Sequence, residues 1–329
     1  MRTDEPFTLA EGQASGLSPK ALRHRRLAIP TRGLRVAAEQ ADALPVRAAA
    51  ILRCAPTGSA ISHGSALRLH GVDLPWQVTR DDRVHLSVPG SAVVPRRTGY
   101  VAHTYGADQL PVRLLNGLLV VTPEHAWRQL AGTLPRDELI VLGDSLLRRK
   151  SPASTLGQLR ETVRGTPAGA RGVARMRTAL DDLRTGTDSP METRTRLVLV
   201  RAGLPCPQVN VPVLDEDGRF VALSDMVYVA ERVAIEYDGD VHRTDARTWR
   251  RDVAKRQWLE DLGWRTVVVT ADDVYRHPSR LVARVAALLR SRAVPGRDEK
   301  WGGGPRGGGW RGGTERRGPP RPRRANARP

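Results

Sequence analysis

The chain has 329 residues, more than one domain usually holds, so about two or three domains are expected. Its 53 Lys and Arg against 35 Asp and Glu give a formal charge of +18, which favours a polyanionic partner, nucleic acid before a membrane surface, over an acidic small molecule. With only Cys54 and Cys206, no CxxC pair and no uncharged apolar run near the ~20 residues of a membrane span, neither a disulfide framework nor a cysteine zinc site is indicated. These features predict a soluble cytoplasmic protein without a membrane partner.

The first segment, residues 1–36, combines two short helical patterns with a basic hairpin. Residues 7–15 are predicted to form one helix, and Ser18 followed by Pro19 is typical of the N-cap of a second helix that ends near Arg26. Gly33 permits a tight turn between two short extended pieces. Helix, turn, basic helix and small wing resemble a winged helix-turn-helix, whose second helix enters the major groove of DNA. A solvated basic face on a small helical subdomain is an equal alternative.

Residues 37–150 have the pattern of a small α+β domain, and residues 151–188 that of a helical connector. Alternating apolar residues predict strands at 83–88 and 99–103, and helical spacing predicts helices at 124–130, 137–148 and 171–183. Five histidines fall in the first of these regions, without HExxH or HxH spacing, so structural histidines are favoured over ligands and no chemistry is assigned to them. They are His63, His70, His85, His103 and His125.

Two pieces of this half, LAEGQASGLSPKALRHRRL and ISHGSALRLHGVDLP, carry a family resemblance. They are similar to the N-terminal region of actinobacterial proteins that begin with an AbiEi-type antitoxin winged helix, over roughly the first 130 residues and through weak motifs. The resemblance implies DNA binding of a regulatory kind. The positions expected to contact DNA are basic residues of the first segment: Lys20, Arg23, Arg26 and Arg32.

The pattern becomes regular in residues 189–294. A helix is predicted from Ser189 to about Ala202 and ends at Gly203; strands follow at 208–214, 223–229 and 232–237. A helix at 247–262, a buried strand at 264–270 and a helix at 278–290 complete the series. The predicted class is therefore α/β, with the order α-β-β-β-α-β-α.

Three acids crowd the second and third of these strands. If residues 230–231 form a two-residue loop, Asp225 lies directly opposite Glu236, and Asp238 shares its face two residues further along. Like charges in this position are destabilising, so the arrangement calls for a cation, a raised pKa or a different register. The cation is the leading hypothesis. The loop lacks the Gly or Asn that tight hairpin turns prefer, and a slip of one residue would move Asp225 to the opposite face.

Several short motifs recur in order through this region. They are ET-x-x-R at 192–196, AGLP-x-P at 202–207, SD at 224–225, IEYDG-x-x-H at 235–242, RRD-x-x-x-R at 250–256 and DLGW at 261–264. With the element order, this set resembles the PD-(D/E)XK nuclease fold, and most of all its Vsr-like (very-short-patch-repair-like) endonuclease family. The resemblance implies a restriction-endonuclease-like core that hydrolyses phosphodiester bonds with Mg²⁺ or Mn²⁺, which oxygen ligands suit.

The same resemblance implies roles for individual residues. The metal ligands and catalytic acids would be Glu192, Asp225, Glu236 and Asp238, with His242 assisting proton transfer and Asp252 and Arg256 orienting the site or contacting phosphate. Asp238 stands where many relatives have lysine, which leaves the group that activates the water open. Structural alternatives are helix capping by Glu192, a turn at Asp238 and an exposed or capping His242.

The last 35 residues, 295–329, contain ten Gly and six Pro, and nine Arg and one Lys against three acids, which gives this tail +7 and leaves +11 for residues 1–294. Such a composition is typical of disorder. The leading hypothesis for the whole chain is a metal-dependent DNA endonuclease or nickase targeted by the N-terminal segment. The alternative is a non-catalytic DNA-binding regulator of antitoxin type, and a third hypothesis is RNA as the substrate, which the Arg-Gly tail favours only faintly.

Overall fold

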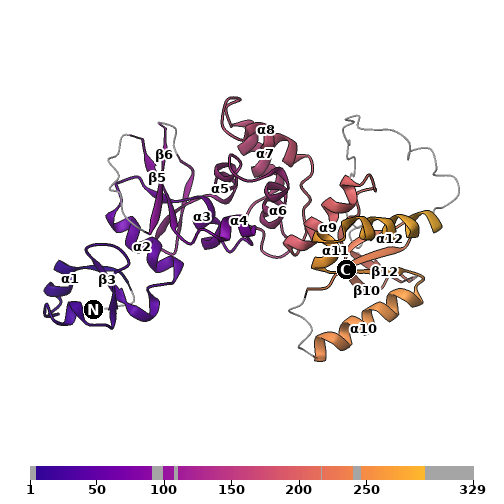
Figure 1. Ribbon diagram of the computed structural model, residues 1–329, viewed down its shortest axis with the longest axis horizontal. Helices are drawn as coiled ribbons and strands as arrows, with labels where there is room; N and C mark the ends of the chain where they lie inside the picture. Colours follow the sequence, from indigo (N-terminus) through magenta and orange to yellow (C-terminus); the bar gives the residue numbers. More distant parts are fainter. Residues whose placement is uncertain (1–4, 91–98, 107–109, 216, 240–245, 293–329) are drawn as a thin grey trace, which may run out of the picture. The chain divides into compact units, whose positions relative to one another are not determined.

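The computed structural model describes residues 5–90, 99–106, 110–215, 217–239 and 246–292, without the side chains of 246–252. These residues form a mixed α/β protein with three separate sheets, of three, five and four strands (Figure 1). In these ranges no helix combines the length and the apolar character that crossing a bilayer requires.

The N-terminal sheet has the order β1-β3-β2, from β1 (Phe7–Thr8), β2 (Leu27–Ala28) and β3 (Leu34–Ala37). Helix α1 (Leu9–Ala14) follows β1 and begins with a capping box between Thr8 and Glu11. The predicted helix at 7–15 is therefore shorter at both ends. Strands β2 and β3 form the expected hairpin, and Gly33 adopts a left-handed φ of 90° between them.

The predicted second helix at 18–26 is wrong. Only a single 3₁₀ turn forms there, Ala21–Arg23, with Lys20 and not Ser18 at its N-cap; the Ser18 hydroxyl accepts the Ala21 N–H at 3.2 Å. The physical reason is that Leu22 is the one buried side chain between Ser18 and Arg26, too few to give a longer helix an apolar face to pack. Gly12 of α1 lies against Leu22 so closely that a Cβ there would meet its Cδ2 at 2.7 Å.

The second sheet has the order β6-β5-β4-β8-β7, and it mixes parallel and antiparallel pairs. Its strands are β4 (Ala60–Ile61), β5 (Val84–Pro89), β6 (Tyr100–Tyr105), β7 (Val112–Leu115) and β8 (Leu118–Val121). Strands β5 and β6 confirm the strands predicted at 83–88 and 99–103. They pair in parallel, with His85 beside Val101 and Ser87 beside His103.

Helices pack around this sheet in one continuous apolar core. They are α2 (Leu44–Cys54), α3 (His63–Leu69), α4 (Trp76–Thr79), α5 (Pro123–Leu130), α6 (Arg136–Leu146), α7 (Leu156–Arg164) and α8 (Val173–Leu180). Helices α5, α6 and α8 confirm three sequence predictions. The core includes Trp127 of α5, Leu159 of α7 and Met176 of α8, so the helices expected as a connector pack into the core of the preceding region.

The third sheet has the order β12-β11-β10-β9, from β9 (Gln208–Leu214), β10 (Phe220–Tyr228), β11 (Val233–Tyr237) and β12 (Arg265–Val269). Helices α9 (Pro190–Arg201), α10 (Ala246–Asp261) and α12 (Pro278–Ser291) complete the predicted α-β-β-β-α-β-α order, to which the structure adds the short α11 (Ala271–Tyr275). Leu199 of α9 and Leu281 of α12 pack with Ile235 on one face, and Leu259 of α10 packs with Ala234 on the other. The sheet is thus covered on both faces, which Figure 1 shows for α10 and α12.

The β10–β11 hairpin has the register that the sequence predicts. Met226 pairs with Ile235 and Val227 with Ala234, and this register places Asp225 beside Glu236, just beyond the last paired residues. The loop is longer than two residues: it runs over 229–232 and is closed by the Arg232 N–H donating to the Val229 carbonyl at 3.2 Å. A tight hairpin turn needs a residue in the left-handed conformation. Arg232, with a φ of 51°, adopts it here, instead of Ala230 or Glu231 of the predicted loop.

Helix α9 is anchored to α6 by buried ion pairs. Arg196, only 1% exposed, donates to Asp144 Oδ2 at 2.7 Å, and Arg194 donates to both carboxylate oxygens of Glu138 at 2.5 and 2.7 Å. The arginine of the ET-x-x-R motif therefore faces α6 rather than the acids of the third sheet. Removing one partner of such a buried pair typically costs about 3–5 kcal/mol.

Candidate active site

Four charged side chains from four elements meet at the third sheet, and we call them the acid cluster: Glu192 of α9, Asp225 of β10, Glu236 of β11 and Lys255 of α10. Lys255 Nζ donates to Glu236 Oε2 at 2.5 Å, and the Ser224 hydroxyl donates to Glu236 Oε1. Asp225 Oδ2 accepts the Tyr237 backbone N–H at 2.8 Å. The hairpin register therefore brings the two strand acids together, as the sequence predicts.

A break in strand β9 helps to shape this site. Val209 packs in the core beneath α9 and α12, whereas Val211 and Val213 pack in the core beneath α10, although simple alternation would place all three on one face. Asn210, which lies between them, has a left-handed φ of 48°, a conformation that Asn tolerates better than most residues. Its side-chain amide donates to Glu192 Oε2 at 2.9 Å. Asn210 thus both bends the strand and fixes the helical acid.

The acids of the cluster carry more negative charge than their surroundings balance. Burial raises the pKa of Asp225 to about 7, and the neighbouring Glu236 and Glu192 contribute to this rise against the opposing Tyr237 N–H and Lys255. Burial also raises the pKa of Glu192, which hydrogen bonds from the Asp188 N–H, Ser189 and Asn210 oppose. Near neutral pH, Asp225 is therefore only partly ionised, and a bound cation would favour its carboxylate form.

A divalent ion of the Mg²⁺ type fits the chemistry of this donor set. All its acids offer hard oxygen ligands, and Asp225 Oδ1 accepts no hydrogen bond within the described residues. The ligands are not assembled as a cage, however. Among the described residues, only a histidine group brings three ligand atoms within 4.8 Å of one another. Metal binding at the acid cluster would therefore require Glu236 or Glu192 to exchange a present hydrogen bond for the ion.

The other predicted site residues have different outcomes. Glu192 lies in the capped first turn of α9, where Ser189 Oγ accepts its N–H at 3.2 Å, so its capping position and its place in the cluster coexist. Asp238 follows β11 and donates its backbone N–H to Val269 at 2.8 Å; within the described part no side-chain hydrogen bond or ion pair joins it to the other acids. Its metal role stays a prediction, as do the roles of three further residues. His242 and the side chain of Asp252 lie outside the described residues, and Arg256 is exposed on α10.

Lys255 was missed from the sequence, although a signal for it exists. Lys255 and Leu259 are four residues apart in the predicted helix at 247–262, so they share one helical face. Because Leu259 is fully buried against the sheet, Lys255 must point toward the sheet as well. A lysine from the helix thus stands beside the acids, whereas the residue that follows β11 is Asp238.

A second group of titratable side chains, which we call the histidine cluster, lies at the second sheet. It consists of His63 at the start of α3, His85 of β5 and His103 of β6, each of which offers a ligand atom within 4.8 Å of the others. The rings of His63 and His103 stack at 3.7 Å between centroids, and His85 Nδ1 lies 2.9 Å from His103 Nε2. These histidines could not be singled out from the sequence because their spacing matches no motif. The parallel β5–β6 pairing brings two of them to one face.

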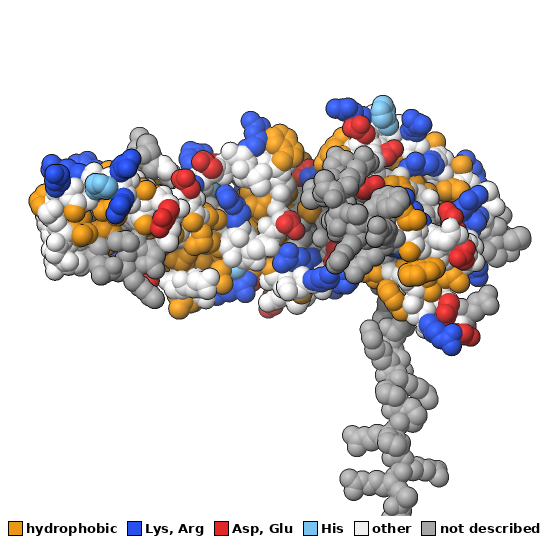
Figure 2. Space-filling view, turned by 90° about the horizontal axis from the view of Figure 1, so that it is seen from below, with side chains coloured by type: hydrophobic (Ala, Val, Ile, Leu, Met, Phe, Trp, Pro, Cys, Tyr) orange, Lys and Arg blue, Asp and Glu red, His pale blue; other side chains and the backbone are white. Residues whose placement is uncertain are grey.

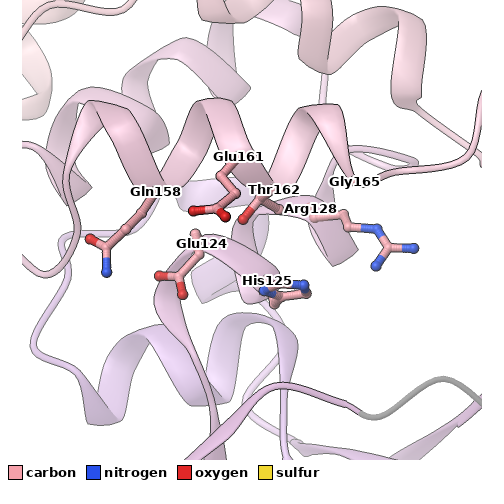
Figure 3. A pocket seen from close by; sticks show the side chains of 7 residues that line it. All are labelled: Glu124, His125, Arg128, Gln158, Glu161, Thr162 and Gly165. Atoms are coloured by element: carbon pink, nitrogen blue, oxygen red, sulfur yellow. The ribbon is translucent and has the colours of Figure 1, made fainter.

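A polar pocket between α5 and α7 shares no residue with either cluster. Figure 3 shows Glu124 and His125 of α5 and Glu161 of α7 directed into it. Its other lining residues are Arg128, Gln158, Thr162 and Gly165.

The basic residues predicted to contact DNA, Arg32 among them, are all exposed. The others, Lys20, Arg23 and Arg26, lie in the same N-terminal segment. Figure 2 shows Lys and Arg side chains gathered at this end of the chain, on the left.

Comparison with known proteins gives two relatives of undescribed activity. "Uncharacterized protein MT2308" of Mycobacterium tuberculosis (strain CDC 1551 / Oshkosh) and "Uncharacterized protein Rv2248" of Mycobacterium tuberculosis (strain ATCC 25618 / H37Rv) are each 28% identical to the chain over 233 residues. The aligned region covers 71% of this chain and 82% of each relative. No family model and no solved structure matches the chain.

Proposed function

We propose that the protein is a metal-dependent nuclease that cleaves phosphodiester bonds in DNA, with the acid cluster as its active centre. The observation that carries the proposal is Asp225: a buried acid beside two other carboxylates and a lysine, with a pKa raised to about 7. Such convergence of perturbed groups is typical of catalytic sites. The element order and the hairpin register that supply these groups are those expected of a PD-(D/E)XK nuclease of the Vsr-like kind.

Each side chain has a role in this proposal. Asp225 and Glu236 would hold the ion, with Glu192, fixed by Asn210, as the third carboxylate. When bound, a Mg²⁺ or Mn²⁺ ion supplies positive charge for the phosphate and lowers the pKa of a water. Lys255 holds Glu236 in place and carries a charge that stabilises the phosphate oxygens as negative charge develops on them. In this proposal Lys255 also takes the place of the lysine that many relatives have at the position of Asp238.

The charge of the chain supports nucleic acid as the substrate. Residues 1–294 carry +11 without the tail, and exposed basic residues such as Lys20 and Arg23 lie on the N-terminal segment. Contacts of this kind neutralise phosphates and make binding strongly dependent on salt. In this proposal the N-terminal segment holds the DNA through its exposed basic side chains, without the recognition helix that was predicted at 18–26. We favour DNA over RNA because the first segment resembles a DNA-binding module.

The test is nicking of supercoiled plasmid by the full chain in the presence of Mg²⁺ or Mn²⁺, with a duplex RNA in parallel. We expect Asp225→Asn and Glu236→Gln to abolish nicking while the fold, followed by circular dichroism, is retained. Asp272→Asn is the matched control, since this acid lies on α11 in an exposed ion pair with Arg276. Equal nicking by wild type and Asp225→Asn would refute the proposal.

A second candidate function, a DNA-binding regulator that does not cut, is favoured by one observation. Among the described residues, the three acids do not bring three ligand atoms within 4.8 Å of one another, whereas the histidine cluster does. If calorimetry detects no Mg²⁺ or Mn²⁺ binding that depends on Asp225, and duplex DNA binds in a salt-sensitive manner, the regulator is the better description.

A further inference from the structure

The histidine cluster has the supporting contacts of a ligand site. His85 Nε2 lies 3.2 Å from Asp81 Oδ2, and Asp81 is itself held by Arg83, whose Nε and second terminal nitrogen donate at 2.8 and 2.7 Å. An Nε2 proton directed to Asp81 would leave the lone pair of His85 Nδ1 facing His103 Nε2, 2.9 Å away. A carboxylate that orients a histidine in this way is the usual outer partner of a metal-binding imidazole.

His63 is also held in position from several sides. Its backbone N–H donates to Gln129 Oε1 at 3.0 Å, and Gln129 Nε2 in turn donates to the Ser87 hydroxyl at 3.0 Å. The Ser62 hydroxyl lies 3.0 Å from His63 Nδ1. His63 adopts a left-handed φ of 51° at the start of α3, a conformation that costs a residue with a side chain on the order of 1 kcal/mol. The surroundings therefore hold the ring where it stacks on His103.

The three rings are uncharged in this environment. Burial lowers the pKa of His63 to about 3 and that of His103 to about 4, and the neighbouring imidazoles act in the same direction on both. Burial also lowers the pKa of His85, against the opposing charge of Asp81. Metal ions bind the neutral imidazole, so no proton has to be removed from an imidazolium before binding.

We propose that His63, His85 and His103 bind one divalent transition metal ion of the zinc type, with Asp81 orienting His85. At zinc–nitrogen distances of ~2.0–2.1 Å, two nitrogens in a tetrahedral site lie about 3.4 Å apart. The 2.9 Å between His85 Nδ1 and His103 Nε2 needs only a small opening to reach this value. The site shares no residue with the acid cluster, so it can be tested independently of the proposed nuclease activity.

The ligand chemistry selects the class of ion. Three imidazoles suit Zn²⁺, Ni²⁺, Co²⁺ or Cu²⁺, whereas Mg²⁺ and Ca²⁺ take oxygen ligands. Three protein ligands leave a coordination position for water or a further group, as in zinc sites that are open to chemistry. The ion would also join the start of α3 to β5 and β6, three pieces of chain that are distant in the sequence.

The experiment is calorimetric titration of chelator-treated full-length protein with ZnCl₂, followed by visible absorption spectra with CoCl₂. We expect one Zn²⁺ per chain at this site, and d–d bands of nitrogen-bound Co²⁺. His103→Gln removes a ligand and should abolish both signals. Asp81→Asn keeps all three ligands and should weaken Zn²⁺ binding by about 10–100-fold, the usual effect of losing such an outer partner.

His125→Gln is the matched control, because His125 is a half-buried histidine of the same region outside the cluster. It should bind Zn²⁺ as the wild type does, and so should Asp225→Asn, which separates this site from the acid cluster. Equal Zn²⁺ affinity in wild type, His103→Gln and Asp81→Asn overturns the proposal, as does a wild type that binds no Zn²⁺. If His103→Gln fails to fold by circular dichroism, Asp81→Asn and the Co²⁺ spectrum of the wild type still decide.

Discussion

The acid cluster and the histidine cluster respond to burial in opposite ways. Burial disfavours whichever form of a group is charged, so it raises the pKa of Asp225 to about 7 and lowers that of His63 to about 3. Near neutral pH the first site therefore tends to keep a proton, and the second has already lost its own. A cation at the acid cluster must displace a proton, whereas one at the histidine cluster meets rings that are already uncharged and has only to replace the hydrogen bond between His85 and His103.

The two sites also differ in how closely their ligand atoms are already arranged for binding an ion. The histidine cluster has three ligand atoms within 4.8 Å of one another, while the carboxylates of the acid cluster are engaged by Lys255, Ser224 and Asn210. Oxygen ligands select Mg²⁺ or Mn²⁺, and imidazoles select Zn²⁺ and its neighbours. One chain can thus present two cation sites that do not compete for the same ion.

After the acids themselves, the largest effect is expected from Lys255. Lys255→Met leaves Glu236 without its cation and removes a charge beside the phosphate, so we expect the nicking rate to fall by roughly 10²–10⁴-fold, as for other groups that act in the transition state. Zn²⁺ binding should not change. Plasmid nicking under single-turnover conditions measures the rate, and Gln257→Met, an exposed position on the same helix, is the control. An unchanged rate would remove Lys255 from the active centre.

Much of the acid cluster follows from the sequence because its partners are close along the chain. A short hairpin fixes Asp225 against Glu236, and alternation within two adjacent strands needs no knowledge of the rest of the fold. Lys255 could also have been predicted from the sequence, because it shares a helical face with Leu259. The role of Asn210 could not be predicted, because the alternation of side chains along a strand does not indicate where the strand will be interrupted.

The histidine cluster was beyond such reasoning for a physical reason. Its members join through the parallel pairing of β5 with β6 and through the position of α3, and neither parallel pairing nor helix placement is encoded in local periodicity. The error at 18–26 has a different origin. There Ser18 accepts the Ala21 N–H, but the helix that it was predicted to cap does not form, because a single buried side chain, Leu22, cannot hold a helix onto its neighbours.

The second prediction concerns the anchor of α9, which carries Glu192. Arg196→Met leaves Asp144 buried without its cation, and we expect a loss of about 3–5 kcal/mol in the free energy of unfolding. Asp144→Asn together with Arg196→Met should recover part of this loss, because the uncompensated charge is then gone. Urea denaturation at pH 7 measures both. A double variant no more stable than the single one would show that packing, not charge, dominates the cost.

The third prediction is a pair of opposite pH dependences. Asp225 has a folded pKa above its unfolded value, so its contribution to stability is complete below pH ~4 and is lost as pH rises through about 7. The histidines have folded pKa values below their unfolded ones, so stability is lost as pH falls from ~6.5 toward the folded values of about 4 for His103 and about 3 for His63. A tenfold difference in proton affinity between the folded and unfolded states corresponds to about 1.4 kcal/mol of unfolding free energy.

Chemical denaturation of metal-free protein between pH 4 and 8 tests this pair. Relative to wild type, Asp225→Asn should gain stability as pH rises from 5 to 8, and His63→Gln should lose the penalty that the wild type suffers between pH 6 and 4. If the difference in unfolding free energy between wild type and each variant does not change between pH 4 and 8, burial does not set the charge of either cluster. Added Mg²⁺ should restore stability to the wild type at pH 8 and have no such effect on Asp225→Asn.

The smallest effect is expected at Asn210, where backbone and side-chain roles can be separated. Asn210→Gly keeps the left-handed backbone and loses only the hydrogen bond to Glu192, so we expect stability to change by about 1 kcal/mol. Asn210→Ala loses the same bond and also strains the backbone at φ 48°, which adds about 1 kcal/mol or more. Both variants free Glu192, so both should lower nicking equally while their unfolding free energies differ. Unequal nicking would mean that the bend in β9, and not the hold on Glu192, is what the acid cluster needs from this residue.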